Sequence, residues 1–339
     1  MIPQNLTDLG WTASLQDDIT EAEAMLPPAR LTALHRGRVE AIAASGPIEL
    51  LCPPNLPVTV MAVGDWVLCD GPRVARVLAR TTLLQRRAAG TGTEAQLIAA
   101  NVDTMFITTS CNGDFNAARI ERYLVLAHSA GITPVVLLTK ADLADPAAFV
   151  AAAAALSAGL SVLALNAKSA EVATALAPWV QKGQTAVLLG SSGVGKSTIA
   201  NSLGANQATG DIREVDAKGR HTTTARNLLP LTAGGWLIDT PGVRELQLTD
   251  VADGIDILFS DLIDLSAQCR FRDCQHDHEP GCAVQAAIAA GSIDAARLPR
   301  WRKLVTEEKT NTAAMATSRV RAAGKHTKKS ATKWRAPKK

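Results

Sequence analysis

The sequence predicts a multidomain α/β protein with an N-terminal β-barrel, a central domain of alternating strands and helices, and a mostly helical C-terminal domain. Three observations predict it. Short strand-like runs fill 38–78, strands and helices alternate from residue 103 onward, and three of the six cysteines cluster ahead of helix-like segments near the C-terminus. A chain of 339 residues can hold two or three domains, and 47% hydrophobic residues is ordinary for a globular protein.

These changes of pattern divide the chain into five segments. We expect an N-terminal extension at 1–32, the barrel at 33–92, the α/β domain at 93–250, the C-terminal domain at 251–318 and a basic tail at 319–339. The first ten residues carry no secretion signal, so we expect a cytoplasmic protein. The uncharged stretch 146–167 is long enough to span a bilayer, but it is alanine-rich and interrupted by Gly159, so we predict a helix and a strand and no membrane partner.

The barrel is predicted from four strand-like runs, at 38–42, 48–52, 64–68 and 74–78. Proline-containing turns separate some of them. Several short strands at this spacing suggest a small barrel, and the OB type among small barrels commonly binds oligonucleotides. A barrel with a purely structural role fits the sequence equally well.

The central domain is organised around a glycine-rich turn that follows the apolar run 185–189 and matches G-x4-G-K-S. Glycines let such a turn close its backbone N–H groups around phosphates. Lys196 would add a charge for the β- and γ-phosphates, and the Ser197 hydroxyl would bind Mg²⁺. The residues predicted to hold the phosphates are Gly190, Ser191, Ser192, Gly193, Val194, Gly195, Lys196, Ser197 and Thr198.

Two strand ends before this turn predict a base-binding site. The strand 133–138 ends in Thr139-Lys140-Ala141-Asp142. A carboxylate at Asp142 could accept two hydrogen bonds from the N1–H and amine of guanine, and adenine offers no such pair. The strand 161–165 ends in Asn166-Ala167-Lys168, a loose match to the turn whose backbone N–H meets guanine O6. An ordinary strand-to-helix turn explains that second match equally well.

A third motif follows the glycine-rich turn. The strand 236–238 leads into Asp239-Thr240-Pro241-Gly242. Asp239 at a strand end can hold Mg²⁺ through water, and the Gly242 N–H can sense a γ-phosphate. The guanine motif precedes the phosphate-binding turn, which is the reverse of the order in an ordinary GTPase, so the sequence indicates a circular permutation.

The six cysteines form two groups of three. We interpret the first group as chemically inert and the second as a metal site. Three isolated cysteines are expected to be small core residues, namely Cys52, Cys69 and Cys111. Without a secretion signal, the clustered Cys269, Cys274 and Cys282 favour a metal over a disulfide. Three buried thiols are the alternative.

The net charge of +3 is unevenly distributed along the chain. The segment 319–339 contains nine lysines and arginines and no acidic residue, so we expect it to be disordered when free. Such a segment would neutralise RNA phosphates, and Trp334 could stack on a base. A solvated tail that only aids solubility is the alternative.

The chain resembles the ribosome small-subunit-dependent GTPase A (RsgA) family over nearly its whole length. The stretches that carry the resemblance are 64–67 (Gly-Asp-Trp-Val), 98–103 (Ile-Ala-Ala-Asn-Val-Asp), 190–197 (Gly-Ser-Ser-Gly-Val-Gly-Lys-Ser), 219–224 (Gly-Arg-His-Thr-Thr-Thr) and 239–245 (Asp-Thr-Pro-Gly-Val-Arg-Glu). The resemblance implies an OB-type barrel, a circularly permuted P-loop GTPase domain and a zinc-binding C-terminal domain. One departure is Thr139, where the family's guanine motif usually has Asn.

The resemblance also implies cofactors and partners. One structural Zn²⁺ would be bound by Cys269, Cys274, His276 and Cys282, with no position left for water. The family pattern favours His276 over His278. The implied partners are the small (30S) ribosomal subunit with its rRNA, together with GTP and GDP, and Mg²⁺ would accompany GTP. We expect a monomer.

We therefore predict an enzyme, a GTPase that acts in late maturation of the small subunit and hydrolyses GTP to drive its own release. A non-catalytic GTP-binding RNA scaffold and a P-loop ATPase are the alternatives, and Asp142 argues against the ATPase. Many GTPases orient water with a Gln just after D-x-x-G, but Val243 stands here, so turnover should be slow without the subunit. The predicted catalytic residues are Lys196, Thr223, which would close on Mg²⁺, and His221, unless the ribosome supplies the group.

Overall fold

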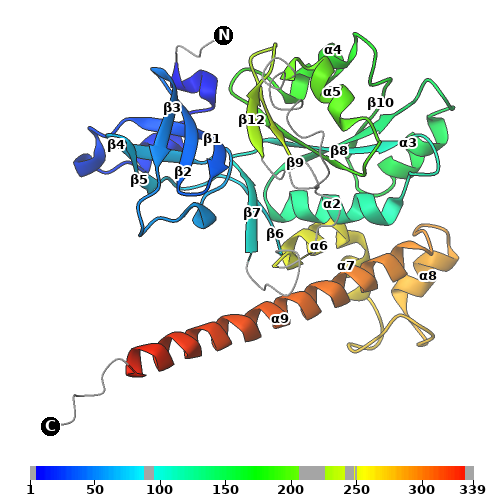
Figure 1. Ribbon diagram of the computed structural model, residues 1–339. Helices are drawn as coiled ribbons and strands as arrows, with labels where there is room; N and C mark the ends of the chain where they lie inside the picture. Colours follow the sequence, from blue (N-terminus) through cyan, green and yellow to red (C-terminus); the bar gives the residue numbers. More distant parts are fainter. Residues whose placement is uncertain (1–4, 88–94, 206–225, 241–247, 249, 333–339) are drawn as a thin grey trace, which may run out of the picture. The chain divides into compact units, whose positions relative to one another are not determined.

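The structure is a computed structural model that describes residues 5–87, 95–205, 226–240, 248 and 250–332, with only the backbone described at 87, 95 and 315–332 (Figure 1). It divides into two compact units. One comprises Met1–Gln85 with Leu97–Glu245, and the other comprises Arg86–Gln96 with Leu246–Lys339. No helix within the described ranges has the length and apolar character needed to cross a bilayer.

The N-terminal half of the first unit is a closed five-stranded barrel. Its strands are β1 (Pro28–His35), β2 (Arg38–Ala43), β3 (Gly46–Leu51), β4 (Trp66–Asp70) and β5 (Arg73–Val77). The barrel closes because β1 pairs with both β2 and β4, while β3 and β4 both pair with β5. Alternate residues such as Leu31, Val39 and Val67 fill its core. The predicted barrel is confirmed, and β1 is a strand that the sequence analysis missed.

From residue 5 to the start of the barrel, the structure describes three short helices, η1 (Leu6–Leu9), α1 (Ala13–Asp17) and η2 (Glu21–Glu23). This segment is held by the buried Arg30 of β1, whose guanidinium donates to the carbonyls of Leu9 and Asn101 and, at 2.8 Å, to the hydroxyl of Thr185. Burial lowers the pKa of Arg30 to about 10, and the carboxylates of Asp103 and Asp65 oppose that shift. One cation therefore joins the N-terminal segment, the barrel and the central domain.

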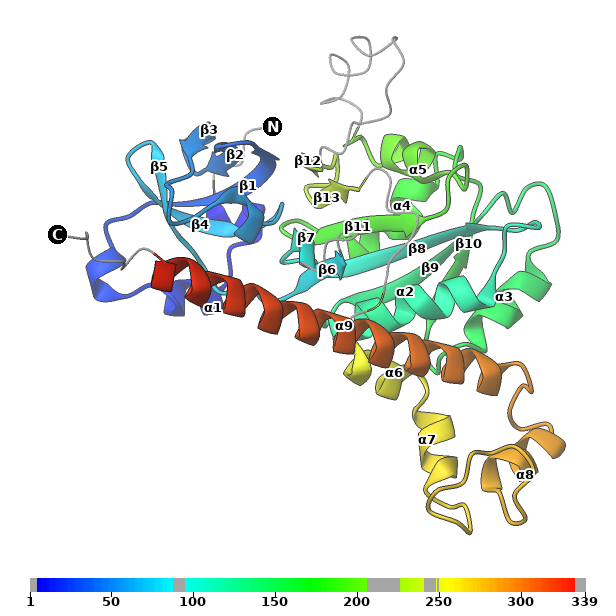
Figure 2. The ribbon, with the colours of Figure 1, turned by 60° about the horizontal axis from the view of Figure 1, so that its bottom comes forward.

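The central domain contains a parallel sheet with helices on both faces. The strands run in the order β10 (Ser161–Ala164), β9 (Thr133–Thr139), β8 (Thr104–Ser110), β11 (Thr185–Gly190) and β13 (Trp236–Asp239). The helices α2 (Ala117–Ser129) and α3 (Ala147–Ala154) lie on one face, while α4 (Val172–Leu176) and α5 (Lys196–Ser202) lie on the other (Figure 2). Because crossover helices cover both faces, β8 and β11 are buried along their whole length and β9 is buried from Val135 onward.

A single sheet runs through the barrel and the central domain. The strand β12 (Asn227–Pro230) is antiparallel to β13, and its Asn227 pairs with Ala33 of β1. In the described part of the chain, this sheet therefore contains eleven strands. The remaining described strands, β6 (Leu83–Arg87) and β7 (Ala95–Ala100), pair with each other.

The described part of the second unit is mostly helical. Its helices are α6 (Ala252–Leu258), α7 (Ser260–Ser266), α8 (Ala283–Ala289) and α9 (Arg297–Thr332). Arg297 is buried at the start of α9 and donates to the carboxylate of Asp261 at 2.9 Å and to the carbonyl of Leu258 at 2.8 Å.

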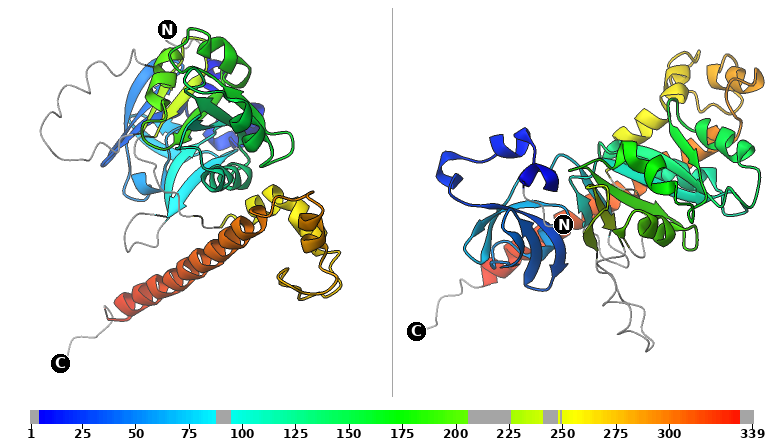
Figure 3. Two further views of the ribbon diagram at one scale, coloured as in Figure 1. Left: turned by 90° about the vertical axis from the view of Figure 1, so that its right-hand side faces the viewer. Right: turned by 90° about the horizontal axis from the view of Figure 1, so that it is seen from above.

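The backbone corrects one prediction about the tail. The helix α9 continues unbroken to Thr332, so the expected disorder from residue 319 is wrong for 319–332 (Figure 3). The reason is that this segment is rich in Ala, Lys and Arg, which have high helix propensity and lose little rotamer freedom in a helix. The prediction for 333–339 lies outside the described residues.

Candidate nucleotide-binding site and metal centre

The glycine-rich turn joins β11 to α5, as the sequence predicts, and its glycines take conformations that other residues cannot. Gly190 has φ +149°, and a Cβ there would lie 2.1 Å from the carbonyl oxygen of Thr108. Gly195 has φ +100° and immediately precedes α5. A side chain is therefore excluded at Gly190 by the neighbouring backbone, and at Gly195 it is disfavoured by the positive φ.

Polar groups line this turn. Lys196 donates from Nζ to the carbonyl oxygen of Gly190 at 2.9 Å and to that of Ser191 at 2.5 Å, so its ammonium lies over the turn. Ser192, Gly193 and Ser197 are exposed, and among the described atoms the Ser191 Oγ is buried without a hydrogen-bond partner. A cradle of this kind fits the phosphates of a nucleotide.

The Thr139 side chain connects the predicted guanine motif to the turn. Thr139 is fully buried at the end of β9, and its hydroxyl faces the carbonyl oxygen of Val194 at 2.6 Å and that of Thr109 at 3.1 Å. A hydroxyl has one hydrogen to donate, so the nearer Val194 carbonyl is the main acceptor. Lys140 follows with φ +59°, and the Asp142 side chain is exposed. The chain thus brings the base motif against the phosphate-binding turn.

The second base motif lies beside the first. Leu165 donates from its backbone to Leu138 at 2.9 Å, which places the end of β10 next to the end of β9. The Asn166 Oδ1 accepts a hydrogen bond from the Lys168 N–H at 2.9 Å, so this segment forms an Asx-turn. Ala167, between them, is buried. The two base motifs, separated in sequence, therefore share one edge of the sheet.

Asp239 ends β13, next to β11 in the same sheet. The following Thr240 is buried, and its hydroxyl donates to the carbonyl of Leu188 at 3.1 Å, which fixes the end of β13 against β11. The Asp239 side chain is exposed at this point. Three predicted residues, His221, Thr223 and Gly242, lie outside the described residues.

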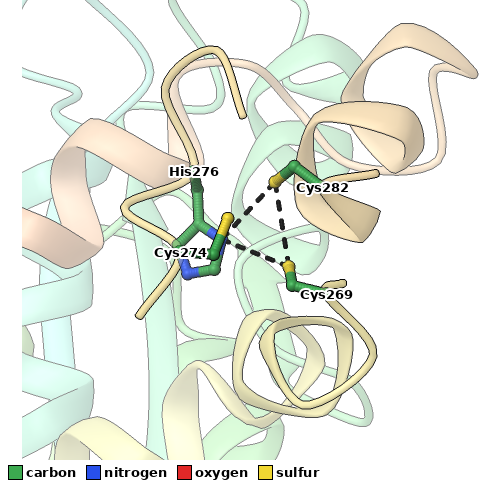
Figure 4. Close-up of side chains that lie close together, drawn as sticks. All are labelled: Cys269, Cys274, His276 and Cys282. Carbon is green, nitrogen blue, oxygen red and sulfur yellow. Dashed lines mark hydrogen bonds between the residues drawn. The ribbon is translucent and has the colours of Figure 1, made fainter. Parts of the chain in front are cut away.

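A second cluster of chemically reactive side chains lies between α7 and α8. The four side chains are Cys269, Cys274, His276 and Cys282, and their ligand atoms all lie within 4.8 Å of one another (Figure 4). The His276 Nδ1 is 3.5 Å from the Sγ atoms of both Cys269 and Cys282, and these two sulfurs are 3.8 Å apart. Three sulfurs and one imidazole nitrogen form a donor set that suits tetrahedral Zn²⁺.

The orientation of His276 is fixed from its other ring nitrogen. The Ser266 hydroxyl donates to the Leu262 carbonyl at 2.6 Å, so its oxygen can accept a hydrogen bond from the His276 Nε2, which is 3.1 Å away. This places the hydrogen on Nε2 and directs the Nδ1 lone pair toward the sulfurs. Burial, and then the charge of Arg302, lower the pKa of His276, which favours the neutral ring that metal binding needs.

The thiols also fit a bound cation. Burial raises the pKa of Cys274 to about 11, and the nearby Cys282 and Cys269 contribute to the increase. Three thiolates this close would repel one another, and a divalent metal would remove that cost. The Cys282 Sγ caps α8 by accepting from the Gln285 N–H at 3.4 Å. The cluster could therefore hold a metal ion.

The loop that carries the histidine is shaped by one carboxylate. Glu279 accepts backbone hydrogen bonds from Gln275 at 2.7 Å, from Asp277 at 2.9 Å and from His278 at 3.1 Å. These bonds lower the pKa of Glu279 to about 2. They form a tight turn in which His276 has φ +60° and belongs to the cluster, whereas His278 is exposed.

Two supporting residues, Ser266 and Gln285, were missed by the sequence analysis. The Ser266 hydroxyl orients His276, and the Gln285 side chain donates to the His276 carbonyl. No sequence pattern points to either residue, because both lie outside the Cys/His motif and reach His276 only in the folded chain.

Comparison with known proteins finds sequence matches to one family. The model of the RsgA GTPase family matches residues 77–249. A protein of Mesorhizobium japonicum named small ribosomal subunit biogenesis GTPase RsgA is 52% identical over 316 residues, which are 91% of this chain and 91% of that protein. A Vibrio vulnificus protein named small ribosomal subunit biogenesis GTPase RsgA 2 is 46% identical over 94% of this chain and 92% of its own length.

Two solved structures resemble the fold. The crystal structure of YjeQ from Thermotoga maritima aligns with a TM-score of 0.61 at 26% identity, covering 84% of this chain and 98% of that one. The structure of YloQ, described as a circularly permuted GTPase, aligns with a TM-score of 0.59 at 24% identity, covering 87% and 99%. The fold of this chain is therefore similar to that of a solved structure described as a circularly permuted GTPase.

Proposed function

Since this chain belongs to the RsgA GTPase family, we propose that it binds the small ribosomal subunit and its rRNA during late maturation and hydrolyses GTP to drive its own release. GTP hydrolysis and a role in ribosome biogenesis are the activities of this family. The protein would act as a monomer in the cytoplasm, where its ribosomal partner is assembled.

One observation supports guanine nucleotide binding above all others. The buried hydroxyl of Thr139 lies 2.6 Å from the Val194 carbonyl, so the T-K-x-D strand end is joined to the phosphate-binding turn. An isolated T-K-x-D sequence carries little information, but its contact with a G-x4-G-K-S turn supports the proposal that a base site lies next to a phosphate site. Asn166 and Ala167 would complete the base site through the Ala167 backbone N–H.

The described residues have distinct roles in this proposal. The N–H groups of 190–198 and the Lys196 ammonium would hold the phosphates, and Asp142 would pair with guanine. Mg²⁺ would neutralise charge on the phosphates, and Ser197 and Asp239 would hold it, with Thr223 from outside the described residues. Lys196 would contribute to catalysis by stabilising charge on the transferred phosphoryl group.

Zinc is the metal we propose for the Cys/His cluster. Its four side chains supply a complete tetrahedral shell of three thiolates and one imidazole, which leaves no position for a reacting water. The ion would therefore be structural and would hold the start of α8 against the end of α7.

The GTPase assay with and without purified small subunits tests the proposed function. We expect slow turnover by the protein alone and a large stimulation by the subunit, because Val243 cannot orient water. Lys196→Ala should abolish the stimulated rate and serves as the negative control. GTP binding without turnover on subunits would favour the RNA scaffold, and equal use of ATP would favour the ATPase.

Exchange of the carboxylate at Asp142 should change the base that the protein prefers. Asp142→Asn should weaken GTP binding and favour xanthine nucleotides, because the amide can donate to the 2-oxo group where guanine has an amine. Competition binding with GTP, XTP and ATP measures this preference. Asp145→Asn, a change at an exposed carboxylate in the same loop, is the matched control and should keep the preference for GTP. An Asp142→Asn variant that still prefers GTP to XTP would contradict the assignment.

A further inference from the structure

The last residue of α5, Ser202, makes a contact that none of the sequence motifs accounts for. Its Oγ lies 2.9 Å from the carbonyl oxygen of Ala167 and 3.1 Å from that of Thr198, one turn earlier in the same helix. A serine in a helix often bonds only to the carbonyl four residues back. Here the nearer acceptor belongs to a different element, the Asn166-Ala167-Lys168 turn.

This contact connects the two halves of the nucleotide site. The first residues of α5 are Lys196 and Ser197, which belong to the phosphate half, and its last residue is Ser202. The Ala167 carbonyl is part of the turn expected to present an N–H to guanine O6. The Ala167 carbonyl lies in one planar peptide group with the Lys168 N–H, which donates to the Asn166 Oδ1 at 2.9 Å. The Ser202 bond and the Asx-turn therefore fix the peptide group that directly follows the Ala167 N–H.

A packing contact supports the same connection. A Cβ placed on Gly195 would lie 3.5 Å from the Ala167 Cβ and 3.7 Å from the Thr139 Cγ2. Ala167 and Thr139, from the two base motifs, therefore both pack against the glycine that precedes α5. Two hydroxyls then tie these motifs to the phosphate half, Thr139 to Val194 and Ser202 to Ala167.

We propose that Ser202 is a positioning residue for guanine recognition, which holds the Ala167 turn in register with the phosphate-binding helix. Ser202 does not touch the nucleotide in this scheme. Its hydroxyl holds the turn that carries the O6-binding Ala167 N–H at a fixed distance from the phosphate site. The base and the phosphates of one nucleotide can then bind at the same time. The inference rests on the proposed guanine nucleotide site and assigns a specificity role to a residue outside its motifs.

The test compares Ser202→Ala with Ser202→Thr. Loss of one hydrogen bond of this kind should raise the Kd for GDP and speed GDP release by about fivefold, and Ser202→Thr, which keeps the hydroxyl, should restore most of the affinity. Ser169→Ala is the matched control, since the Ser169 Oγ accepts from the Glu171 N–H next to the same turn and, within the described residues, Ser169 has no hydrogen bond to α5. It should bind GDP as the wild type does.

A nucleotide series separates positioning from a general loss of structure. The diphosphate of 2,6-diaminopurine riboside has an amine in place of the O6 acceptor, so it cannot use the contact that Ser202 supports. It also lacks the N1–H and keeps only the 2-amine for Asp142, so it should bind more weakly than GDP to every variant, and the comparison is the ratio of each variant's Kd to that of the wild type. The Ser202→Ala penalty should therefore be present for GDP and nearly absent for this analogue. An equal penalty for both nucleotides, or no penalty for GDP, would overturn the inference.

The same experiment distinguishes the two levels of the proposal. A wild-type protein with no preference for GDP over ADP would refute the guanine site itself. A wild-type protein that prefers GDP, together with a Ser202→Ala variant that matches it in affinity and release rate, would refute only the role of Ser202.

Discussion

His221→Ala should remove most of the GTP hydrolysis that the small ribosomal subunit stimulates, a loss on the order of 10²-fold or more. Phosphoryl transfer needs an in-line water, and the position that many GTPases fill with a water-orienting Gln is Val243, whose side chain cannot form hydrogen bonds. His221 is close in sequence to Thr223, and an imidazole can orient or deprotonate a water near neutral pH. All three residues lie outside the described part of the chain.

Single-turnover hydrolysis on saturating small subunits is the measurement for His221→Ala. Affinities for GTP and for the subunit should stay close to those of the wild type, because the proposed role concerns water and not binding. His278→Ala, at an exposed histidine outside the metal cluster, is the matched control and should keep the stimulated rate. If His221→Ala also kept that rate, the catalytic group would come from the ribosome.

Cys274→Ser should abolish stable zinc binding and unfold or loosen the region between α7 and α8. Structural zinc contributes about 10–16 kcal/mol of apparent binding free energy in zinc-finger peptides, and this energy is coupled to folding. A serine hydroxyl does not replace a thiolate as a zinc ligand, so three of the four positions would remain. The nucleotide site should be much less affected, because none of its residues belongs to this unit.

Elemental analysis and thermal unfolding measure the effect of Cys274→Ser. We expect about one zinc per wild-type chain and a much lower zinc content in the variant. Only the variant should show an early unfolding transition. Cys52→Ser, at a half-buried thiol of the barrel, should keep the zinc content and is the matched control. Freshly purified wild-type protein without zinc, prepared without chelators, would refute the metal assignment.

The local motifs were predictable because each needs only a short stretch of chain. Glycines at positions 190 and 195 indicate positive φ angles. A continuous apolar run before each motif indicates the strand that leads into it. The contacts between motifs were not predictable in this way. The pairing of the Ser202 hydroxyl with Ala167, or of Ser266 with His276, depends on the placement of elements that no local pattern determines.

In two regions the amino-acid composition or residue type suggests a structure different from the one observed. The density of basic residues in 319–332 favours disorder, but Ala, Lys and Arg also favour a helix, and the backbone continues α9. On β1, the residue type of Arg30 predicts a position at the surface. Its burial depends on carbonyls from Leu9 and Asn101, which meet only in the folded chain.

The pairing of β1 with β12 imposes an order on folding during synthesis. Along one edge, β1 pairs with β4 at Pro28–Arg30 and with β12 at Ala33, so β4 covers only part of that edge. The barrel can assemble once residue 77 has been made, but Ala33 has no strand partner on this side until the ribosome has added Asn227. Contacts between residues so far apart in sequence form late and slowly, and an unpaired edge can associate with other chains. A nascent chain of this protein therefore carries an incomplete barrel edge from the completion of β5 at Val77 until Asn227 has been added.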